Sequence, residues 1–396
     1  MTAFHTLLLN GIFLGLVFLI LPFDTFLKKF SVSNFKCFDK RITFDLSDPA
    51  NYSFNQQVIQ GGVKAKGIIY GANGSGKSNF ALAIFDIVLH LTDKEKLLKK
   101  YLPYRCLDSK SSITEFQYDF VFDNIDVVYR YGKTDPQTLV YESLYIAGVE
   151  VLSYRFDAQT GHVDLPGAES LSLSTDLPTE SDRLSRVKYV KSNAILRDEP
   201  SARAFRAFTS FVDNMLMFYS LDERGYQGLS VGSDIFTQGI IREGKMEDFQ
   251  EFLRQQGISL NLVSVDVNGV PELYCRFEGG TVPFASVAST GTMSLALYYY
   301  WYIKMSKASL VFIDEFDAFY HFELSRSIVE MLRDLEGVQV FITTHNTDLL
   351  TNDLMRPDVY FILKEGEIRS LEKLTPKELR LAHNLQKMFK AGAFDG

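Results

Sequence analysis

Eight consecutive residues of this chain have the types and the spacing of a phosphate-binding loop. Gly71, Ala72, Asn73, Gly74, Ser75, Gly76, Lys77 and Ser78 fit the pattern G-x-x-x-x-G-K-[ST] without a gap. Glycines let the backbone bend tightly, so that several N–H groups can converge on a polyphosphate. Lys77 would reach the β- and γ-phosphates, and the Ser78 hydroxyl would ligate Mg²⁺. The loop predicts a site for a nucleoside triphosphate with Mg²⁺.

A second group of reactive residues lies in the C-terminal third. The apolar stretch 309–313 ends in Asp314 and Glu315, and the apolar stretch 338–344 ends in His345. We expect the first stretch to form a strand beside the strand that precedes the loop. Asp314 would then hold Mg²⁺, and Glu315 would orient an attacking water. Lys77, Glu315 and His345 are therefore the predicted catalytic residues, and Ser78 and Asp314 the predicted metal ligands.

The elements that must position these residues alternate between strand and helix. The sequence predicts a buried strand over 67–70 before the loop and an apolar helix over 79–85 after it, whose N-terminus faces the phosphates. Further predicted elements are a strand over 30–38 paired with 41–46, an antiparallel sheet within 113–156, strands near 260–267 and 273–277, and a helix over 322–335 that ends at Gly337. This order predicts an α/β fold.

Composition divides the chain into four parts. Residues 1–24 are a hydrophobic N-terminal segment, 25–164 a first lobe with the phosphate loop, 165–262 a polar, helical insertion, and 263–396 a second lobe with the carboxylates. The apolar run 7–21 is shorter than the roughly 20 residues that span a bilayer. Three interpretations remain open for it: an inner-membrane anchor, a secretory signal, or residues translated from upstream of the true start.

Charge and cysteine content restrict the function classes. The formal net charge of −8 argues against a globally basic nucleic-acid binder. The three cysteines are far apart, which suits reduced thiols in a cytoplasmic protein and excludes a CxxC zinc site. A run of basic residues over 183–206 would meet DNA or RNA phosphates or the acidic surface of a partner, or else form a solvated helix face.

The order of four motifs resembles a known family. Gly71–Ser78 is followed by Ser-Thr-Gly-Thr at 289–292, by Ile313–Asp317 and by Thr343–Asn346. This order resembles the ABC-type ATPase heads of SMC, recombination-repair and OLD proteins, and most closely the stand-alone AAA-family ATP-binding proteins of bacterial phage-defence (abortive infection) operons. The resemblance covers 27–396. It implies a P-loop NTPase of the ABC/SMC-head type, with a mixed sheet, an antiparallel β subdomain and a helical insertion.

The resemblance also implies a composite site. In that family two heads enclose two ATP molecules, so Ser289 and Gly291 would contact the γ-phosphate from the opposite copy. Asn34 and Lys36 would lie near the nucleotide, and Asp317 in a loop that couples the two sites. The implied cofactors are ATP and Mg²⁺, and the implied partners are a second copy, in an ATP-dependent homodimer, and an effector protein from the same operon.

Departures from the family pattern narrow the function. Ser-Thr-Gly-Thr is not the Leu-Ser-Gly-Gly-Gln of transporters, which weakens a transport role. The sequence does not identify the glutamine of the loop that senses Mg²⁺, and Gln117 is one candidate. We expect an ATPase, converting ATP and water to ADP and phosphate, whose dimerisation regulates an effector in phage defence. The alternatives are a DNA-repair ATPase, an ATP-regulated nuclease with metals on Asp314, Glu315 and Asp317, and a nucleotide-binding scaffold.

Overall fold

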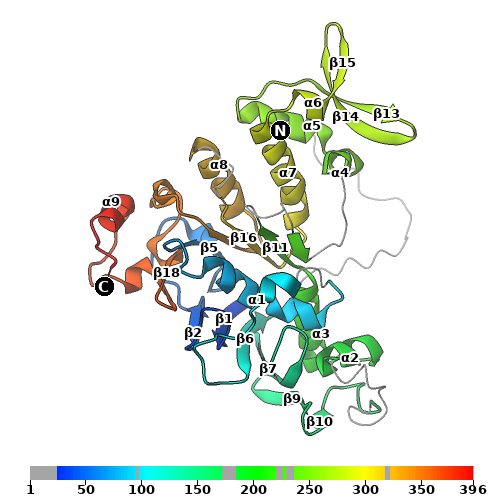
Figure 1. The fold of residues 1–396 in the computed structure, drawn as a ribbon, viewed down its shortest axis with the longest axis vertical. Helices are drawn as coiled ribbons and strands as arrows, with labels where there is room; N and C mark the ends of the chain where they lie inside the picture. The colour runs from blue at the N-terminus through cyan, green and yellow to red at the C-terminus, as the bar shows by residue number, and fades with distance from the viewer. Residues whose placement is uncertain are drawn as a thin grey trace, which may run out of the picture.

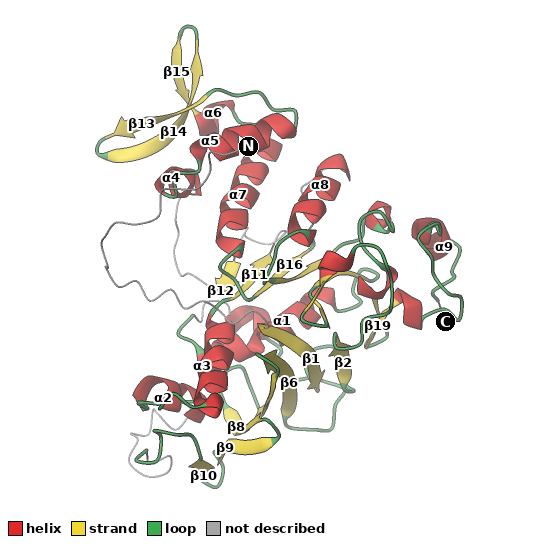
Figure 2. Cartoon of the chain, turned by 180° about the vertical axis from the view of Figure 1, so that it is seen from behind, coloured by secondary structure: helices red, strands yellow, loops and turns green. Residues whose placement is uncertain are grey.

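Two large β-sheets and the helix between them form the body of the protein. The structure, a computed structural model, describes residues 25–94, 98–171, 184–219, 226–228, 236–316 and 322–395. Within these residues one seven-stranded sheet is antiparallel and a second seven-stranded sheet is mixed. Helix α1 (Lys77–Leu91) lies between the two sheets in both views (Figures 1 and 2). The α/β fold with an antiparallel β subdomain, as predicted, is confirmed.

The antiparallel sheet has the strand order β10-β9-β8-β7-β6-β1-β2. Side chains alternate in burial along β6, where Thr114 and the aromatic residues Phe116, Tyr118, Phe120 and Phe122 are the buried set. The bounds are β1 Thr25–Ser33, β2 Ile42–Asp45, β6 Thr114–Phe122, β7 Ile125–Lys133, β8 Leu139–Ile146, β9 Val149–Arg155 and β10 Thr160–Val163. The predicted strand over 30–38 instead begins at Thr25 and ends at Ser33, because Asn34 and Lys36 turn the chain with positive φ angles of 56° and 50°.

The mixed sheet has the strand order β12-β11-β16-β17-β5-β18-β19. Its five inner strands are parallel, and the two edge strands are antiparallel to their neighbours. The bounds are β5 Lys66–Tyr70, β11 Met215–Tyr219, β12 Tyr226–Gly228, β16 Leu310–Asp314, β17 Gln339–Thr343, β18 Tyr360–Lys364 and β19 Glu367–Ser370. The expectation that β16 lies beside β5 is wrong, because β17 lies between them and pairs with both.

Alternating side chains on the mixed sheet face two hydrophobic cores. Ile69, Phe312 and Phe341 pack into the core that contains α1 and the antiparallel sheet. Ile68, Val311 and Ile342, each one position away, pack into the core that contains helices α7 (Thr290–Met305) and α8 (Phe322–Arg333). A strand buried on both faces has an almost continuous apolar sequence, which is why β5, β16 and β17 were recognisable from the sequence alone.

The remaining elements surround this body. The other helices are α2 Arg186–Asn193, α3 Pro200–Asp213, α4 Phe236–Arg242, α5 Met246–Gln255, α6 Phe284–Val287 and α9 Leu385–Lys390. Strands β13 Leu262–Val267, β14 Val270–Phe277 and β15 Gly280–Pro283 form a small sheet that projects beyond α5 and α6 (Figure 1), and β3 Ile59–Gln60 pairs with β4 Val63–Lys64. Short 3₁₀ turns occupy Gln56–Val58, Leu98–Tyr101, Thr347–Leu349, Pro357–Val359 and Leu371–Lys373.

The span 165–262 differs from the separate helical insertion that its polar composition predicted. Helix α3 packs on the antiparallel sheet, where the rings of Phe208 and Phe211 lie 5.4 and 5.2 Å from that of Phe120. Strand β11 pairs in parallel with β16 over five residue pairs and so belongs to the mixed sheet. Over the described residues, no helix combines the length and the apolar character needed to cross a membrane; the apolar run 7–21 lies outside them.

Two buried polar contacts hold the sheets and α1 in place. The side-chain amide of Gln339 on β17 accepts from Leu27 N at 2.6 Å and donates to Leu27 O at 3.0 Å, beside a bulge in β1. On α1, Asp86 accepts from Lys133 Nζ at 2.7 Å, and from the hydroxyls of Tyr131 and Tyr104 at 2.9 Å each. Because every charge and amide is paired, these contacts specify how the layers meet without leaving an unsatisfied group.

Lys66 on β5 is a buried cation that faces α8. Its amine donates to Val338 O among apolar side chains that include Val329 and Leu332. Burial disfavours the charged form and lowers the pKa of Lys66 from 10.5 to about 7, while the Asp334 carboxylate opposes this shift.

We expect the free energy of unfolding to rise less steeply with pH in Lys66→Met than in the wild type. The folded-state pKa lies below the unfolded-state value, so the unfolded chain binds more protons between about pH 7 and 10.5, and stability rises with pH in that window. Between pH 7 and about pH 9, urea denaturation should show a rise that is roughly 2 kcal/mol smaller in the variant than in the wild type. The exposed Lys110→Met is the control, and an identical pH dependence of Lys66→Met and wild type would contradict the assignment.

Candidate functional site

The phosphate loop connects β5 to α1 and has the backbone that its glycines predict. Gly74 and Gly76 have φ angles of 77° and 98°, which side-chain-bearing residues rarely adopt. A Cβ atom on Gly76 would lie 2.7 Å from Cys37 Sγ, so glycine is needed there for space as well as for conformation. Helix α1 has no side-chain cap. Its first N–H groups therefore face the loop, where they could donate hydrogen bonds to a bound anion.

Lys77 and Ser78 occupy the first turn of α1. The Lys77 amine lies over the loop and donates to Gly71 O at 2.9 Å and Ala72 O at 3.2 Å, and the Ser78 side chain is exposed. A cationic amine, an uncapped helix N-terminus and a hydroxyl fit a polyphosphate that carries Mg²⁺, a hard cation that prefers oxygen ligands. Lys77 and the loop N–H groups would hold the phosphates, and Ser78 with Asp314 would hold the metal.

Asp314 and Glu315 stand at the carboxyl end of β16, as predicted. Asp314 is buried, and its Oδ1 accepts from the hydroxyl of Thr343 at 2.7 Å. Glu315 leaves the strand with a φ of 49°, in the left-handed region. This abrupt change of backbone direction presents the two neighbouring carboxylates differently, although they are adjacent in sequence.

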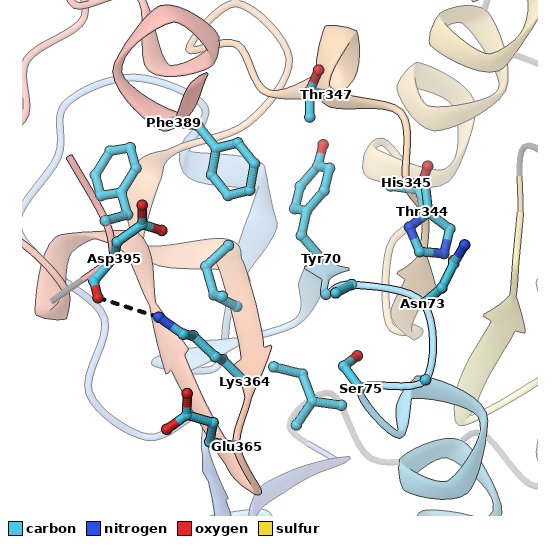
Figure 3. A pocket seen from close by; sticks show the side chains of 16 residues that line it. Tyr70, Asn73, Ser75, Thr344, His345, Thr347, Lys364, Glu365, Phe389 and Asp395 are labelled. Atoms are coloured by element: carbon cyan, nitrogen blue, oxygen red, sulfur yellow. Dashed lines mark hydrogen bonds between the residues drawn. The ribbon is translucent and has the colours of Figure 1, made fainter. Parts of the chain in front are cut away.

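His345 follows β17 and lies beside the phosphate loop. With Thr344 it lines a pocket of about 630 Å³, whose wall also includes the loop residues 71–75. Figure 3 shows His345, Thr344 and Asn73 close together at one side of this pocket, with Tyr70 and Phe389 toward the other side. The structure thus brings His345 to the loop even though 267 positions separate it from Ser78 in the sequence.

A second pocket flanks the loop on its other side. It has a volume of about 530 Å³ and is lined by residues 37–41 of the β1–β2 connection, by Gly74 and Ser75, and by residues 365–367. The loop is therefore open to solvent-filled space on both sides, enough for the base and ribose of a nucleotide whose phosphates rest on the loop.

Ser289 and Gly291 lie at the N-terminus of α7, away from the phosphate loop. Ser289 caps the helix by accepting from Thr292 N at 3.1 Å, and a Cβ on Gly291 would meet only Ser289 Oγ, at 3.7 Å. The C-terminal end of α7 leads into β16, and the helix of 16 residues is about 24 Å long. Its exposed N-terminus therefore points away from the mixed sheet (Figures 1 and 2) and lines neither pocket of its own chain.

Asn34 and Lys36, expected near the nucleotide, have other contacts. The Asn34 amide donates to Ser111 O and Ile113 O at 2.8 and 2.9 Å and accepts from Cys106 N at 3.1 Å. Lys36 Nζ donates to Lys100 O at 3.0 Å, and its burial lowers the pKa of the amine. Both side chains hold the 98–113 segment, and their place near the nucleotide stays a prediction.

The structure places some of the other residues that the sequence suggested for ligand binding. Gln117 donates to Asp119 Oδ1 at 2.8 Å and accepts from Arg41 at 3.0 Å on β6, outside both pockets. The basic residues of 188–206 pair with acidic residues of the chain, among them Lys188 with Asp93 and Lys191 with Asp213, which favours a solvated face over a nucleic-acid surface. Asp317 lies outside the described residues, within which no group of three or more metal-ligating side chains gathers.

Four contributors to the site were not foreseen. Cys37 packs under Gly76, Tyr70 and Phe389 line the larger pocket, and the hydroxyl of Thr343 holds the carboxylate of Asp314. Thr343 stood in the motif Thr343–Asn346, but a threonine in an apolar strand gives no signal of a polar role. The contacts of Cys37 and Phe389 depend on tertiary packing that sequence spacing does not show.

The fold and the site have the architecture of a P-loop NTPase, and comparisons with known proteins can be set beside it. A family model described as "AAA domain, putative AbiEii toxin, Type IV TA system" matches residues 274–351. This span includes Ser289, Asp314 and His345 but not the phosphate loop. Among solved structures the chain is similar to the SMC head domain from Thermotoga maritima, with 14% identity and a TM-score of 0.42 over 89% of this chain and 99% of that chain. A search of the curated proteins returned no match.

We expect Gly76→Ala to destabilise the protein more than Gly74→Ala. Both substitutions place an alanine at a positive φ, which costs about 1–2 kcal/mol. A Cβ at Gly74 meets nothing within 4 Å, whereas one at Gly76 collides with Cys37 Sγ at 2.7 Å. Urea denaturation of both variants measures the difference, and adding Cys37→Ala should reduce it. If both variants lose the same free energy of unfolding, close packing under Gly76 does not contribute to stability.

Proposed function

We propose that this protein binds ATP with Mg²⁺ and hydrolyses it to ADP and phosphate. The observation that carries the proposal is that the phosphate loop, the Asp314–Glu315 pair and His345 meet at the carboxyl edge of β5, β16 and β17. In open α/β sheets, ligands bind at this edge. The family match over 274–351 supports the same chemistry.

Each residue has a role in the proposed reaction. The loop N–H groups and Lys77 hold the β- and γ-phosphates and stabilise the charge that develops on transfer. Ser78 and Asp314 would hold Mg²⁺, which would supply positive charge to neutralise the phosphates. Glu315 orients the water for in-line attack, and His345, on the neighbouring strand, contacts the γ-phosphate side of the site. The proton of the attacking water passes toward the Glu315 carboxylate.

We further propose that the site is completed by a second copy of the chain. Ser289 and Gly291 are exposed at the N-terminus of α7, and the length of α7 keeps them from their own loop. A helix N-terminus favours an anion, so α7 of one copy would contact the γ-phosphate held by the other. ATP would then join two copies, and hydrolysis would release them.

The dimer would regulate an effector protein encoded in the same operon, in phage defence. The description of the matching family model names a toxin of a toxin–antitoxin system, which supports an effector context for this chain. The monomer and the ATP-bound dimer would expose different surfaces, so the effector could respond to whether ATP is bound.

Lys77→Ala should abolish nucleotide binding. Removing the amine takes away a charge-assisted contact with the phosphates, and we expect the affinity for ATP to fall by at least about 100-fold, or 2.7 kcal/mol. Titration of a fluorescent ATP analogue into the full-length protein measures this. Lys110→Ala, an exposed lysine remote from the loop, is the matched control. Unchanged affinity in Lys77→Ala would refute the phosphate-loop assignment.

Glu315→Gln should trap an ATP-bound dimer. The amide retains the shape of the carboxylate but cannot accept the proton of the attacking water, so ATP persists and the two copies stay joined. Light scattering after size exclusion should show a doubling of mass with ATP and Mg²⁺ and none without them.

The matched control for this dimer is Gly291→Arg added to Glu315→Gln. A bulky side chain on the exposed face of α7 should keep the protein monomeric while ATP still binds. A Glu315→Gln protein that binds ATP and remains monomeric would count against the composite site and leave the phosphate-loop assignment intact.

A further inference from the structure

Two adjacent acidic residues at the end of β16 have very different backbone conformations. Asp314 is the last residue of the strand, and Glu315 turns at once into the left-handed region with a φ of 49°. A residue with a branched or long side chain rarely adopts this region without local support. The support comes from the neighbouring strand β17, at Thr343.

Thr343 contacts three consecutive residues of the turn. Its hydroxyl oxygen lies 2.7 Å from Asp314 Oδ1 and 2.7 Å from Glu315 N, and its carbonyl accepts from Phe316 N at 2.9 Å. The side chain of Thr343 is completely buried. One residue of β17 therefore ties the whole segment 314–316 to the sheet.

The chemistry of the three groups sets the direction of each hydrogen bond. A backbone N–H can only donate, so the Thr343 hydroxyl accepts from Glu315 N. Its single hydrogen is then free to donate to the carboxylate of Asp314, which accepts when ionised. The hydroxyl uses its donor on one member of the acidic pair and an acceptor site on the other.

Threonine suits this position better than other residues of similar size. Its β-branched side chain has a stiff χ1 in a strand, which keeps the hydroxyl aimed at the turn. Valine has the same shape and no hydroxyl, and serine has the hydroxyl with fewer restrictions on its rotation.

We propose that Thr343 is a positioning residue for ATP hydrolysis. It holds the Asp314 carboxylate in the orientation needed for Mg²⁺, and it holds the backbone of Glu315 so that the side chain reaches the attacking water. This inference rests on the proposed ATPase function. Thr343 itself lines neither pocket, so we expect it to act on the reaction through the two carboxylates and to leave nucleotide affinity unchanged.

The test separates turnover from binding in Thr343→Val. We expect kcat to fall by about 10- to 100-fold, because misplacement of reacting groups by a fraction of an ångström has effects of this size. The affinity for the fluorescent ATP analogue without Mg²⁺ should stay at the wild-type value, and the Mg²⁺ concentration for half-maximal activity should rise. Thr343→Ser should recover most of the activity.

Thr114→Val is the matched control. Thr114 is equally buried, and its hydroxyl donates to Asn34 O at 2.7 Å in the antiparallel sheet. It thus reports the effect of losing a buried hydroxyl away from the carboxylates, and its kcat should match the wild type. If Thr343→Val does not fold, the pair Thr343→Ser and Thr343→Ala, which differ only in the hydroxyl, gives the same comparison.

The outcomes distinguish this inference from the function on which it rests. Wild-type hydrolysis together with an undiminished kcat in Thr343→Val would overturn the role of Thr343 and leave the ATPase assignment standing. An equal loss of kcat in Thr114→Val would show a general effect of stability and would also overturn it. Wild-type protein that binds ATP without hydrolysing it would overturn the ATPase assignment and this inference together.

Discussion

The parallel pairing of β16, β17 and β5 is the constraint on which the site depends. Ile313 lies opposite Ile342 in one pair of strands, and Thr343 opposite Ile69 in the other, so all three strands end at the same edge. The phosphate loop, the carboxylates and His345 each follow one of these ends. A slip of one residue in either pairing would turn every side chain to the opposite face and separate the groups. Apolar burial on both faces opposes such a slip, because the alternate residues fill two different cores.

Buried polar groups fix how the other layers meet this sheet. Burial of apolar side chains is not directional, so it brings α1 and the antiparallel sheet together without selecting one arrangement. The Asp86–Lys133 pair on α1 and β7, and the Gln339 amide against Leu27, are directional and fully buried. Removing one partner of such a pair leaves an uncompensated group, so any misaligned packing is disfavoured. Because α1 begins at the phosphate loop, the same contacts that orient the helix also aim its first N–H groups toward that loop.

The sequence predicted the parts of the site that local chemistry dictates. The glycine spacing of the loop, the apolar strands before Asp314 and His345, and the alternation of β6 each have a physical cause within a few residues. The order of the strands in the mixed sheet was predicted wrongly, because the insertion of β17 between β16 and β5 depends on pairing between segments far apart. Strand β11 was hidden in a polar span, and the contacts by which Asn34 and Lys36 hold the 98–113 segment depend on tertiary packing that sequence spacing does not show. Thr343 could not be found from sequence, since its role depends on a neighbouring strand.

The distribution of the site over two copies, as proposed, would make hydrolysis conditional on association. The proposed site is divided between two places: the phosphate loop, the Asp314–Glu315 pair and His345 lie at the carboxyl edge of the mixed sheet, and Ser289 and Gly291 lie at the exposed end of α7, about 24 Å of helix away. Neither half surrounds a γ-phosphate alone. A ligand that contacts both halves binds the pair of chains more tightly than one chain, and by linkage it promotes their association to the same extent. The left-handed turn at Glu315 would then serve the switch as well as the chemistry, because Glu315 directly follows Asp314 and both residues are tied to one buried hydroxyl.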